Sequence, residues 1–447
     1  MARPRWVSGS PYDREIARLA IPAFGALIAE PLYLLADTAV VARLGTSSLD
    51  GLALAVQPLL IAHAVFIFLA YGTTATVGRL LGAGEERQAA HQAVQSVWLA
   101  AVIGVGILIV GQIVAGPVIG LLGGDLGRSG PVRTEALLYL RVSLFGFPFL
   151  LVSLAGVGYL RGLQDTTRPL VASLVSASVN LVIELVLIFG LDRGIGASAL
   201  ATVLAQILAA GMYAVWIGRA VTRQGVRLTP DRSAIGSLAV DGADLFFRTA
   251  ALRGSFTVAT GAAARLGSVA LAAHQIAFEL WAFLALALDA IAIAGQAIVA
   301  RALGAGDRDE ARAISDRMVQ WGVMAGVVAG LVVLVLRPVL PQLFSPDAAV
   351  QSVTAFLLVI LAVGQPVNGV VFALDGILIG AGDLRFLARA MWISALLFVP
   401  LAVAVAWLDH GIGWLWGALT LFMVARLVTL WLRYRTDRWL VVGAHRA

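Results

Sequence analysis

Two carboxylates and a proline stand out in the first apolar stretch of the chain, residues 17–41. Glu30 and Asp37 are seven residues apart, so a helix would place them on one face. Burial and a neighbouring carboxylate both favour the protonated form of a carboxyl group, so Asp37 is a candidate for binding a proton. The alternative is a carboxylate at the water interface that pairs with Arg43. Pro22 lacks a backbone donor and crowds the preceding turn, so it can bend the helix.

A second polar set lies further along the N-terminal half. Asn180 and Glu184 are four residues apart on one helical face, and Thr202 follows in the next apolar stretch. With Asp37, these side chains would form a cluster that binds a proton or, through oxygen ligands, a hard cation such as sodium. We favour the proton because it needs only one carboxylate of suitable affinity. Taken alone, Asn180 and Glu184 equally fit a hydrogen bond between packed helices.

The C-terminal half carries a different set of polar residues. Asn368 and Asp375 lie in one long apolar stretch, and Asp375 is a second functional candidate. Asp244 and Arg248 are four residues apart and opposite in charge, so they are predicted to form a buried structural ion pair.

The composition excludes several classes of protein. Of the 447 residues, 60% are hydrophobic and 13% are charged, and the mean hydropathy is +0.91. Soluble domains have about 45–50% apolar and about 25% charged residues. A soluble enzyme, a disordered chain and a nucleic-acid-binding module are therefore excluded. The chain has no cysteine and five histidines, so we expect no thiolate metal site and no cofactor.

Membrane-spanning helices are the elements that must position these residues. A span needs about 20 mostly apolar residues, and we identify twelve such stretches. They are residues 17–41, 51–78, 92–124, 142–160, 170–191, 194–218, 235–264, 269–300, 318–336, 348–374, 390–408 and 414–432. The sequence therefore predicts an all-α integral membrane protein with twelve transmembrane helices.

The arginines indicate how the chain crosses the membrane. All 32 basic residues are arginine, and with the N-terminus inside, inner segments hold 22 of them, including Arg3, Arg5 and Arg446. Outer segments hold seven. The positive-inside rule then places both termini in the cytoplasm. We expect a multi-pass protein of the bacterial cytoplasmic (inner) membrane.

Four sequence matches in the same order reveal an internal repeat. They pair residues 42–45 with 264–267, 81–84 with 303–306, 148–165 with 366–383, and 191–196 with 408–413. Ala259 stands where the repeat places the counterpart of Asp37, so we expect one half alone to bind the coupling ion. The Gly-Ala-Gly turns at 82–84 and 304–306 lack the lysine of a phosphate-binding loop, so they are predicted to end helices with a left-handed glycine.

The repeat divides the chain into two lobes of six helices. The N-lobe is predicted over residues 1–220, a cytoplasmic linker over 221–232, and the C-lobe over 233–447. Six is an even number, so both lobes insert the same way, as in transporters with parallel repeats. Two such bundles can rock against each other and open a cavity to either side in turn. The remote alternative is a membrane scaffold or enzyme, but no polar cluster near one interface indicates catalysis.

Together these motifs resemble the multidrug and toxic compound extrusion (MATE) family, in particular its DinF-type branch. The motifs are Ala20–Pro22 with Asp37, Gly82–Gly84 before an acid, Tyr159–Asp165, Asn180 with Glu184, Gly196–Thr202, Ala273–Gln275, and Asp375 with Gly380–Gly382. The resemblance covers nearly the whole chain. It implies two six-helix lobes in a V around a central cavity, and a cation-coupled antiporter that exports organic cations and drug-like amphiphiles by alternating access.

The resemblance also implies roles for individual residues. In the DinF-type branch the cation site lies in the N-lobe, with Asp37 as the central carboxylate and Asn180, Glu184 and Thr202 around it. That branch usually has aspartate in the fifth span, and Glu184 keeps the charge but shifts its reach. The sodium-using branch has an acid in the tenth span, where Asn368 stands here, which disfavours coupling through the C-lobe.

Two further transport functions fit the same architecture, namely a lipid-carrier flippase and a natural-product exporter of the same superfamily. A flippase usually has a strongly cationic cavity, whereas the candidates here are mostly acidic. The expected partners are a small amphiphilic or cationic substrate and the lipid bilayer, without nucleic acid. We expect a monomer.

Overall fold

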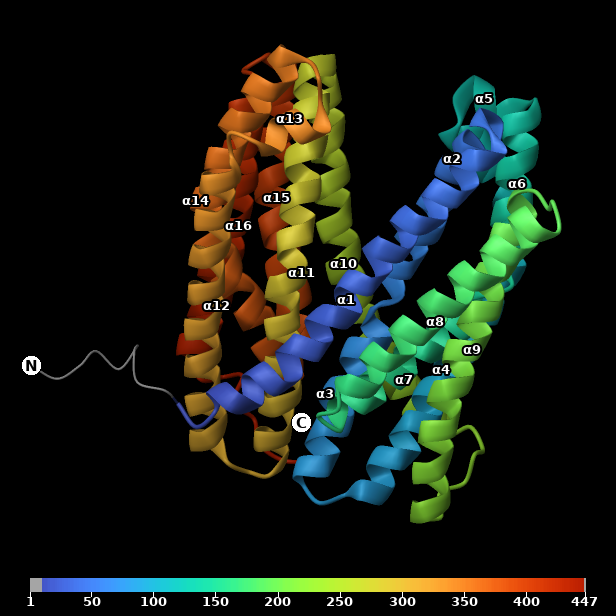
Figure 1. Cartoon of the computed structure of the whole chain (residues 1–447). Coiled ribbons are helices and arrows are strands. Elements are labelled where there is room, and N and C mark those ends of the chain that lie inside the picture. The colour runs from blue at the N-terminus through green and yellow to red at the C-terminus, as the bar shows by residue number, and fades with distance from the viewer. Residues whose placement is uncertain (1–9, 446–447) are drawn as a thin grey trace, which may run out of the picture. The chain divides into compact units, whose positions relative to one another are not determined.

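The computed structural model describes residues 10–445, and within that range the chain consists of helices joined by short turns (Figure 1). Arg3, Arg5 and Arg446, which enter the orientation argument, lie outside the described residues. The chain forms two compact units. Unit 1 combines the chain up to Phe24 with the chain from Ala243 onward, and unit 2 comprises Gly25–Gly242.

Unit 2 contains the second half of α1 (Asp13–Val41) and the helices that follow it. They are the 3₁₀-helix η1 (Ala42–Leu44), α2 (Thr46–Phe66), α3 (Phe68–Gly82), α4 (Glu86–Leu122), α5 (Gly124–Arg128), α6 (Pro131–Leu144), α7 (Phe147–Gly162), α8 (Thr167–Leu185), the π-helix η2 (Val186–Gly190) and α9 (Ile195–Gln224). Helix α7 packs against α3, α4 and α9, while α8 packs against α9 and α2 against α6. The helices α1, α8 and α9 carry the predicted site.

Unit 1 contains the first half of α1 and the remaining helices. They are α10 (Arg232–Arg265), which begins in unit 2, α11 (Ser268–Gly304), α12 (Arg308–Leu336), α13 (Leu340–Phe344), α14 (Ala348–Gly380), α15 (Leu384–Trp407) and α16 (Ile412–Arg435). Helix α14 is central, because it packs against α11, α12 and α16.

All twelve predicted spans coincide with helices. Within residues 10–445, ten helical segments are long and apolar enough to cross a membrane, and α6 with α7, bent by 48° at their junction, form an eleventh. Helix α10 accounts for the twelfth. It has 34 residues, but its six charged residues make it less apolar than the others. The predicted all-α membrane architecture is confirmed.

The internal repeat is visible in the backbone. Matched turns adopt the same left-handed conformation, with φ of 113° at Gly45 and 108° at Gly267, and 77° at Gly84 and 83° at Gly306. The match also includes two aspartates, a residue type that seldom has a positive φ. Asp192 and Asp409, at matched positions of the repeat, both have φ of 51°. Gly84 and Gly306 lie two residues beyond the last residues of α3 and α11, after the capping residues Ala83 and Ala305, which confirms the predicted role of the Gly-Ala-Gly turns.

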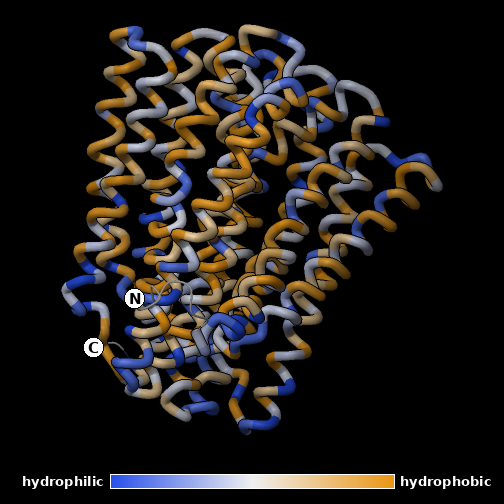
Figure 2. Tube along the Cα trace, turned by 60° about the vertical axis from the view of Figure 1, so that its left-hand side comes forward, coloured by the Kyte–Doolittle hydropathy of each residue, from blue (hydrophilic) through white to orange (hydrophobic). Residues whose placement is uncertain are grey.

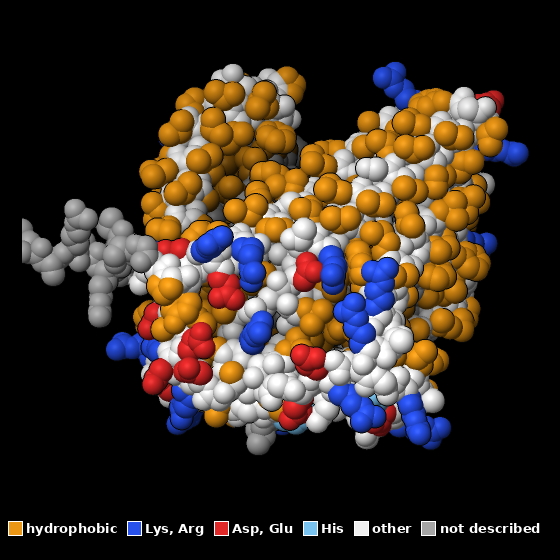
Figure 3. Space-filling view, turned by 60° about the horizontal axis from the view of Figure 1, so that its bottom comes forward, with side chains coloured by type: hydrophobic (Ala, Val, Ile, Leu, Met, Phe, Trp, Pro, Cys, Tyr) orange, Lys and Arg blue, Asp and Glu red, His pale blue; other side chains and the backbone are white. Residues whose placement is uncertain are grey.

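The outer surface is apolar along the helices. Large hydrophobic side chains are strongly exposed on several helices, for example Leu121 at 84% and Val335 at 76%. Figure 2 shows long hydrophobic runs along the helices, with hydrophilic residues mostly near the turns. On the face drawn in Figure 3, most of the arginine, aspartate and glutamate side chains lie in the lower part, a few lie at the upper right, and hydrophobic side chains cover much of the area above the lower part. Exposed apolar surface on this scale is expected of helices that face lipid.

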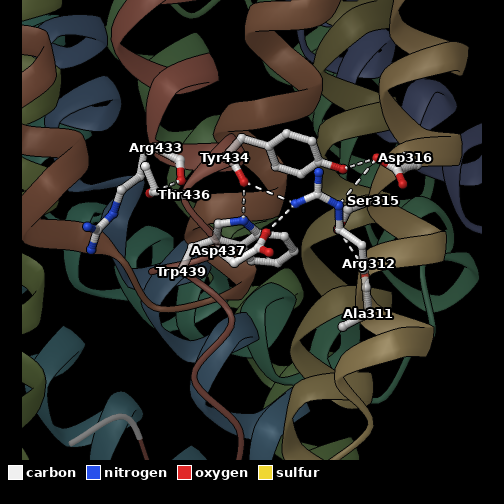
Figure 4. Close-up of polar contacts among 9 residues, drawn as sticks. All are labelled: Ala311, Arg312, Ser315, Asp316, Arg433, Tyr434, Thr436, Asp437 and Trp439. Carbon is white, nitrogen blue, oxygen red and sulfur yellow. Dashed lines mark hydrogen bonds and ion pairs between the residues drawn. The ribbon is translucent and has the colours of Figure 1, made fainter.

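Residues after α16 are fixed to α12 by a polar cluster (Figure 4). Arg312 pairs with Asp437 and lies 4.2 Å from the centre of the Tyr434 ring. The Tyr434 hydroxyl donates to Asp316 at 2.6 Å, and the buried Trp439 donates from Nε1 to the Tyr434 carbonyl at 3.0 Å. These contacts hold the C-terminal segment of unit 1 in place.

The start of α1 is anchored in unit 1. Asp13 accepts hydrogen bonds from Arg317 Nε at 2.6 Å and Nη2 at 2.7 Å, and from Trp321 Nε1 at 2.8 Å. The boundary between the units falls after Phe24, two residues beyond Pro22. Helix α1 therefore passes from unit 1 into unit 2 close to this proline.

The segment between α9 and α10 packs on α4 in unit 2. Trp98 Nε1 donates to the Leu228 carbonyl at 2.8 Å. Asp231 precedes α10, and the Ser233 hydroxyl, which donates to it at 2.8 Å, holds the pKa of Asp231 below its usual range.

The limits of the two observed units, after Phe24 and after Gly242, differ from the predicted lobe limits at residues 220 and 233. The predicted lobe limits stay a prediction.

Helices α12 and α14 approach so closely that only glycine fits between them. A Cβ atom added to Gly326 would lie 2.4 Å from the Gln365 carbonyl oxygen, and one added to Gly322 would lie 2.4 Å from that of Gly369. Small residues at four-residue spacing allow this contact in membrane helices. We expect Gly326→Ala to destabilise the folded protein by about 1–3 kcal/mol, because the helices must separate.

Thermal unfolding followed by size-exclusion chromatography measures this effect. The control is Gly364→Ala on α14, where an added Cβ meets nothing within 4 Å. Equal melting temperatures for the two variants would show that the α12–α14 contact does not limit stability.

Candidate functional site

Asp37 and Glu184 are buried next to each other in unit 2. Asp37 is 1% exposed and Glu184 is 0% exposed. Asp37 Oδ1 accepts a hydrogen bond from the Ser198 hydroxyl at 2.6 Å. The Glu184 carboxyl lies beside Asp37 and Ser198, but neither of its oxygens makes a hydrogen bond of ordinary geometry within the described chain. The alternative that Asp37 sits at the water interface is wrong, because this carboxylate is inaccessible to solvent.

A hydrogen-bonded network borders the carboxylates. The Tyr33 hydroxyl and Thr202 Oγ1 are 2.8 Å apart, and Asn180 Nδ2 donates to both at 3.2 Å. Thr202 also donates to the Ser198 carbonyl at 3.2 Å. The structure thus brings together all four residues that the sequence analysis assigned to the coupling site.

Three helices each contribute two side chains at a spacing of four residues. Helix α1 carries Tyr33 and Asp37, α8 carries Asn180 and Glu184, and α9 carries Ser198 and Thr202. Residues four apart lie on one helical face, so each helix presents its pair in the same direction. The π-helix η2 begins one residue after α8 ends, and such segments are frequent near functional sites.

Tyr33 and Ser198 are the site residues that the sequence analysis missed. Each lies one helical turn before a residue that was identified, Asp37 and Thr202 respectively. Inspection of the i−4 positions would have found both. Within the described chain, no group of three histidines, aspartates or glutamates could hold a metal ion.

A cavity of about 310 Å³ lies next to this network within unit 2. Its lining includes Tyr33, Asn180 and Thr202 from the network, together with Tyr139 and Tyr213. This volume lies at the lower end of the range of pockets that bind small organic molecules. The network therefore separates the buried carboxylates from a space that a substrate can fill.

Glu30 lies in the cavity rather than with the buried carboxylates. Its carboxylate is 3.1 Å from His63 Nδ1, and its side chain is 50% exposed. Seven residues extend about 10 Å along a helix, so a shared face does not bring Glu30 and Asp37 into contact. Pro22 lies within α1, whose helical structure continues through it.

The C-terminal candidates have a different environment. Asp375 Oδ2 accepts from Arg248 Nη2 at 2.7 Å and also pairs with Arg426. The predicted ion pair between Asp244 and Arg248 is wrong, because Asp244 faces Arg385 at 3.7 Å instead. The i,i+4 rule favoured the local partner, but the long arginine side chain reaches a buried carboxylate on another helix. Asn368 is buried in α14 near an aromatic cluster.

Removing the Asp375 charge should unfold this region. We expect Asp375→Asn to destabilise the protein by about 3–5 kcal/mol, because two buried guanidinium groups lose their shared carboxylate. The folded yield after extraction in detergent measures the loss. Adding Arg248→Met should recover part of the yield by removing one of the charges. Normal stability with lost transport would instead give Asp375 a role in coupling.

Comparison with known proteins places the chain in a family. The family model described as MatE matches residues 22–186 and 245–404. Protein DETOXIFICATION 44, chloroplastic, of Arabidopsis thaliana is 31% identical over 442 residues, which cover 95% of this chain and 83% of that protein. DNA damage-inducible protein F of Escherichia coli (strain K12) is 29% identical over 443 residues, covering 96% and 94%.

A solved structure agrees with this assignment at the level of the fold. The crystal structure of MATE in the bent conformation has a TM-score of 0.87 at 22% identity and covers 96% of each chain. The family match spans most of the chain and includes Asp37, Asn180 and Glu184. The chain therefore belongs to the MatE family, the multidrug and toxic compound extrusion transporters, and is a multi-pass membrane transporter and not an enzyme.

Proposed function

We propose that the chain is a proton-coupled antiporter that exports amphiphilic organic cations across a bacterial cytoplasmic membrane. The observation that carries the proposal is the pair of buried carboxylates, Asp37 and Glu184. Two carboxylates in contact cannot both stay ionised in an apolar environment, so at least one binds a proton or a metal cation. No arginine pairs with either of them in the part of the chain that the structure describes, in contrast to Asp375.

The contacts of the site connect proton binding to the substrate cavity. Tyr33 lines the cavity and lies one helical turn from Asp37 on α1. Ser198, which donates to Asp37, lies one turn from the cavity residue Thr202 on α9. A proton that arrives at or leaves Asp37 can therefore shift both helices that shape the cavity.

Coupling requires that the ion distinguish two states of the transporter. A ligand shifts a conformational equilibrium only by its difference in affinity for the two states, so Asp37 must face different surroundings in each. A bend of α1 near Pro22 provides such a change, because this proline weakens the helix before the site. Proton binding from outside would then accompany release of the substrate, and proton release inside would reset the carrier.

Proton coupling is favoured over sodium because a proton needs only one of the two buried carboxylates, Asp37 or Glu184. Sodium needs several oxygen ligands at once, which would have to come from these carboxylates together with Asn180 and Thr202. Uptake of ethidium into energised everted vesicles tests the choice at fixed pH, with and without a sodium gradient. Uptake that needs the proton gradient and ignores sodium supports the proposal. Dependence on sodium alone would assign these oxygens to a sodium ion.

The remaining features of the proposal rest on the sequence. The arginine distribution supports both termini in the cytoplasm, and the internal repeat supports lobes over residues 1–220 and 233–447, joined by a linker over 221–232. We expect a monomer to be sufficient, because the carboxylates and the cavity belong to one unit of one chain. Failure to move any dye, together with rescue of a cell-wall synthesis defect, would favour a lipid-carrier flippase instead.

A further inference from the structure

Among the described residues that line the cavity of unit 2, Glu30 is the only one with a carboxylate side chain. In the part of the chain that the structure describes, no arginine lines the cavity, and His63 is the one histidine of its lining. The walls are otherwise apolar or neutral, with leucines, alanines, serines and tyrosines. A carboxylate among such walls gives the cavity a negative potential, because few neighbouring charges screen it.

Glu30 is placed to accept a hydrogen bond from a nitrogen donor. His63 Nδ1 lies 3.1 Å from Glu30 Oε1 and comes from α2, so one nitrogen is already held at this carboxylate. Half of the Glu30 side chain is exposed, which leaves room for a second donor. Charge-assisted N–H bonds to a carboxylate are shorter and stronger than neutral ones, and they need a hydrogen on the cation.

Neutral acceptors on the same lining add to this preference. Asn180 Oδ1 and Gln206 Oε1 are buried without a hydrogen-bond partner among the described residues. Gln206 packs against Gly146, where an added Cβ would lie 1.8 Å from Oε1. An unpaired buried carbonyl oxygen is unfavourable, and a ligand that supplies an N–H removes this penalty whereas a methyl group does not.

We propose that this cavity selects amphiphiles that carry a protonated amine over quaternary ammonium compounds of the same size, with Glu30 as the residue that determines the choice. The inference rests on the proposed export of organic cations and specifies their class. Glu30 binds the ammonium N–H, and the carbonyl oxygens of Asn180 and Gln206 accept further donors of the substrate on the same lining. The carboxylate that binds the cargo is thereby a different one from Asp37, which binds the coupling proton.

Binding to the purified full-length transporter in lipid nanodiscs tests the proposal. The probes are a naphthalimide fluorophore with a protonated dimethylaminoethyl group and its trimethylammonium derivative, which differ by one methyl group. We expect the wild type to bind the amine roughly tenfold more tightly, since a site built around a donor rejects the analogue that lacks it. Glu30→Gln should reduce this ratio to about twofold or less, because the single N–H of the amine probe loses its carboxylate acceptor.

The control is Asp50→Asn, which removes a carboxylate on the exposed part of α2 outside the cavity and should leave the ratio unchanged. Equal affinity of the wild type for the two probes, or a ratio that Glu30→Gln does not change, would overturn the selection by Glu30. These outcomes leave proton-coupled export intact. Loss of export as a function would instead show as failure of the wild type to bind or move either cation.

Discussion

Replacing Asp37 by asparagine is expected to abolish gradient-driven efflux while leaving the protein folded. Asparagine has nearly the same size and can still accept from Ser198, but it cannot titrate. A rate of efflux about a hundredfold lower corresponds to a free-energy change of about 2.7 kcal/mol. Ionising a buried carboxyl without a partner costs several kcal/mol, so protonation of Asp37 can supply this free energy, and the asparagine variant cannot.

Ethidium uptake into everted vesicles, normalised to the amount of folded transporter, measures this effect. The matched control is Asp50→Asn, an exposed aspartate on α2. We expect control vesicles to accumulate dye as the wild type does and to lose it when the proton gradient is collapsed. Normal uptake by Asp37→Asn would move the coupling site away from the N-terminal half, with Asp375 and its neighbours as the next candidates.

Glu184→Gln is expected to cause a loss of the same order, although Glu184 makes no ordinary hydrogen bond. The glutamate is fully buried beside Asp37, and both of its oxygens lack a partner among the described residues. Such an arrangement is unfavourable for a structural residue but suits a group that exchanges a proton with its neighbour. Glutamine mimics the protonated form but cannot release a proton, so position 184 can no longer exchange one with Asp37.

A double-mutant cycle distinguishes a coupled pair from two independent residues. If Asp37 and Glu184 share their protons, the variant with both substitutions is no less active than either single variant, because each removes the same function. Losses that multiply in the double variant would show that the residues act separately. Full activity of Glu184→Gln would reduce Glu184 to a packing residue of α8.

The fold could be predicted from the sequence because a membrane-spanning helix has a strong and simple signal. Long uncharged stretches located most of the helices, and the repeated turns indicated a division into halves whose limits stay a prediction. The signal is weakest at α10, where six charged residues interrupt the apolar pattern. Neither hydropathy nor the repeat indicated that the first turns of α1 pack with unit 1, because that depends on the contact between Asp13 and Arg317.

The candidate site was predictable where spacing along one helix determines direction. Asn180 and Glu184 share a face of α8, Asp37 and Thr202 stood out as polar residues in apolar stretches, and the resemblance to a family then implied the same four residues. Glu30 shares a helical face with Asp37 but lies two turns away along α1. It therefore pairs with His63 and does not join the buried carboxylates. The partners of Asp375 were not predictable from local spacing, since Arg426 is 51 residues further along the chain.

Substrate-driven proton movement in liposomes tests the central claim most directly. The purified transporter is reconstituted with a pH-sensitive dye inside sodium-free vesicles, and a cationic substrate is added outside without any imposed proton gradient. The account predicts a change of internal pH as protons leave in exchange for the entering cation, and no change with Asp37→Asn. Substrate entry without proton movement, or proton movement that persists in Asp37→Asn, would contradict it.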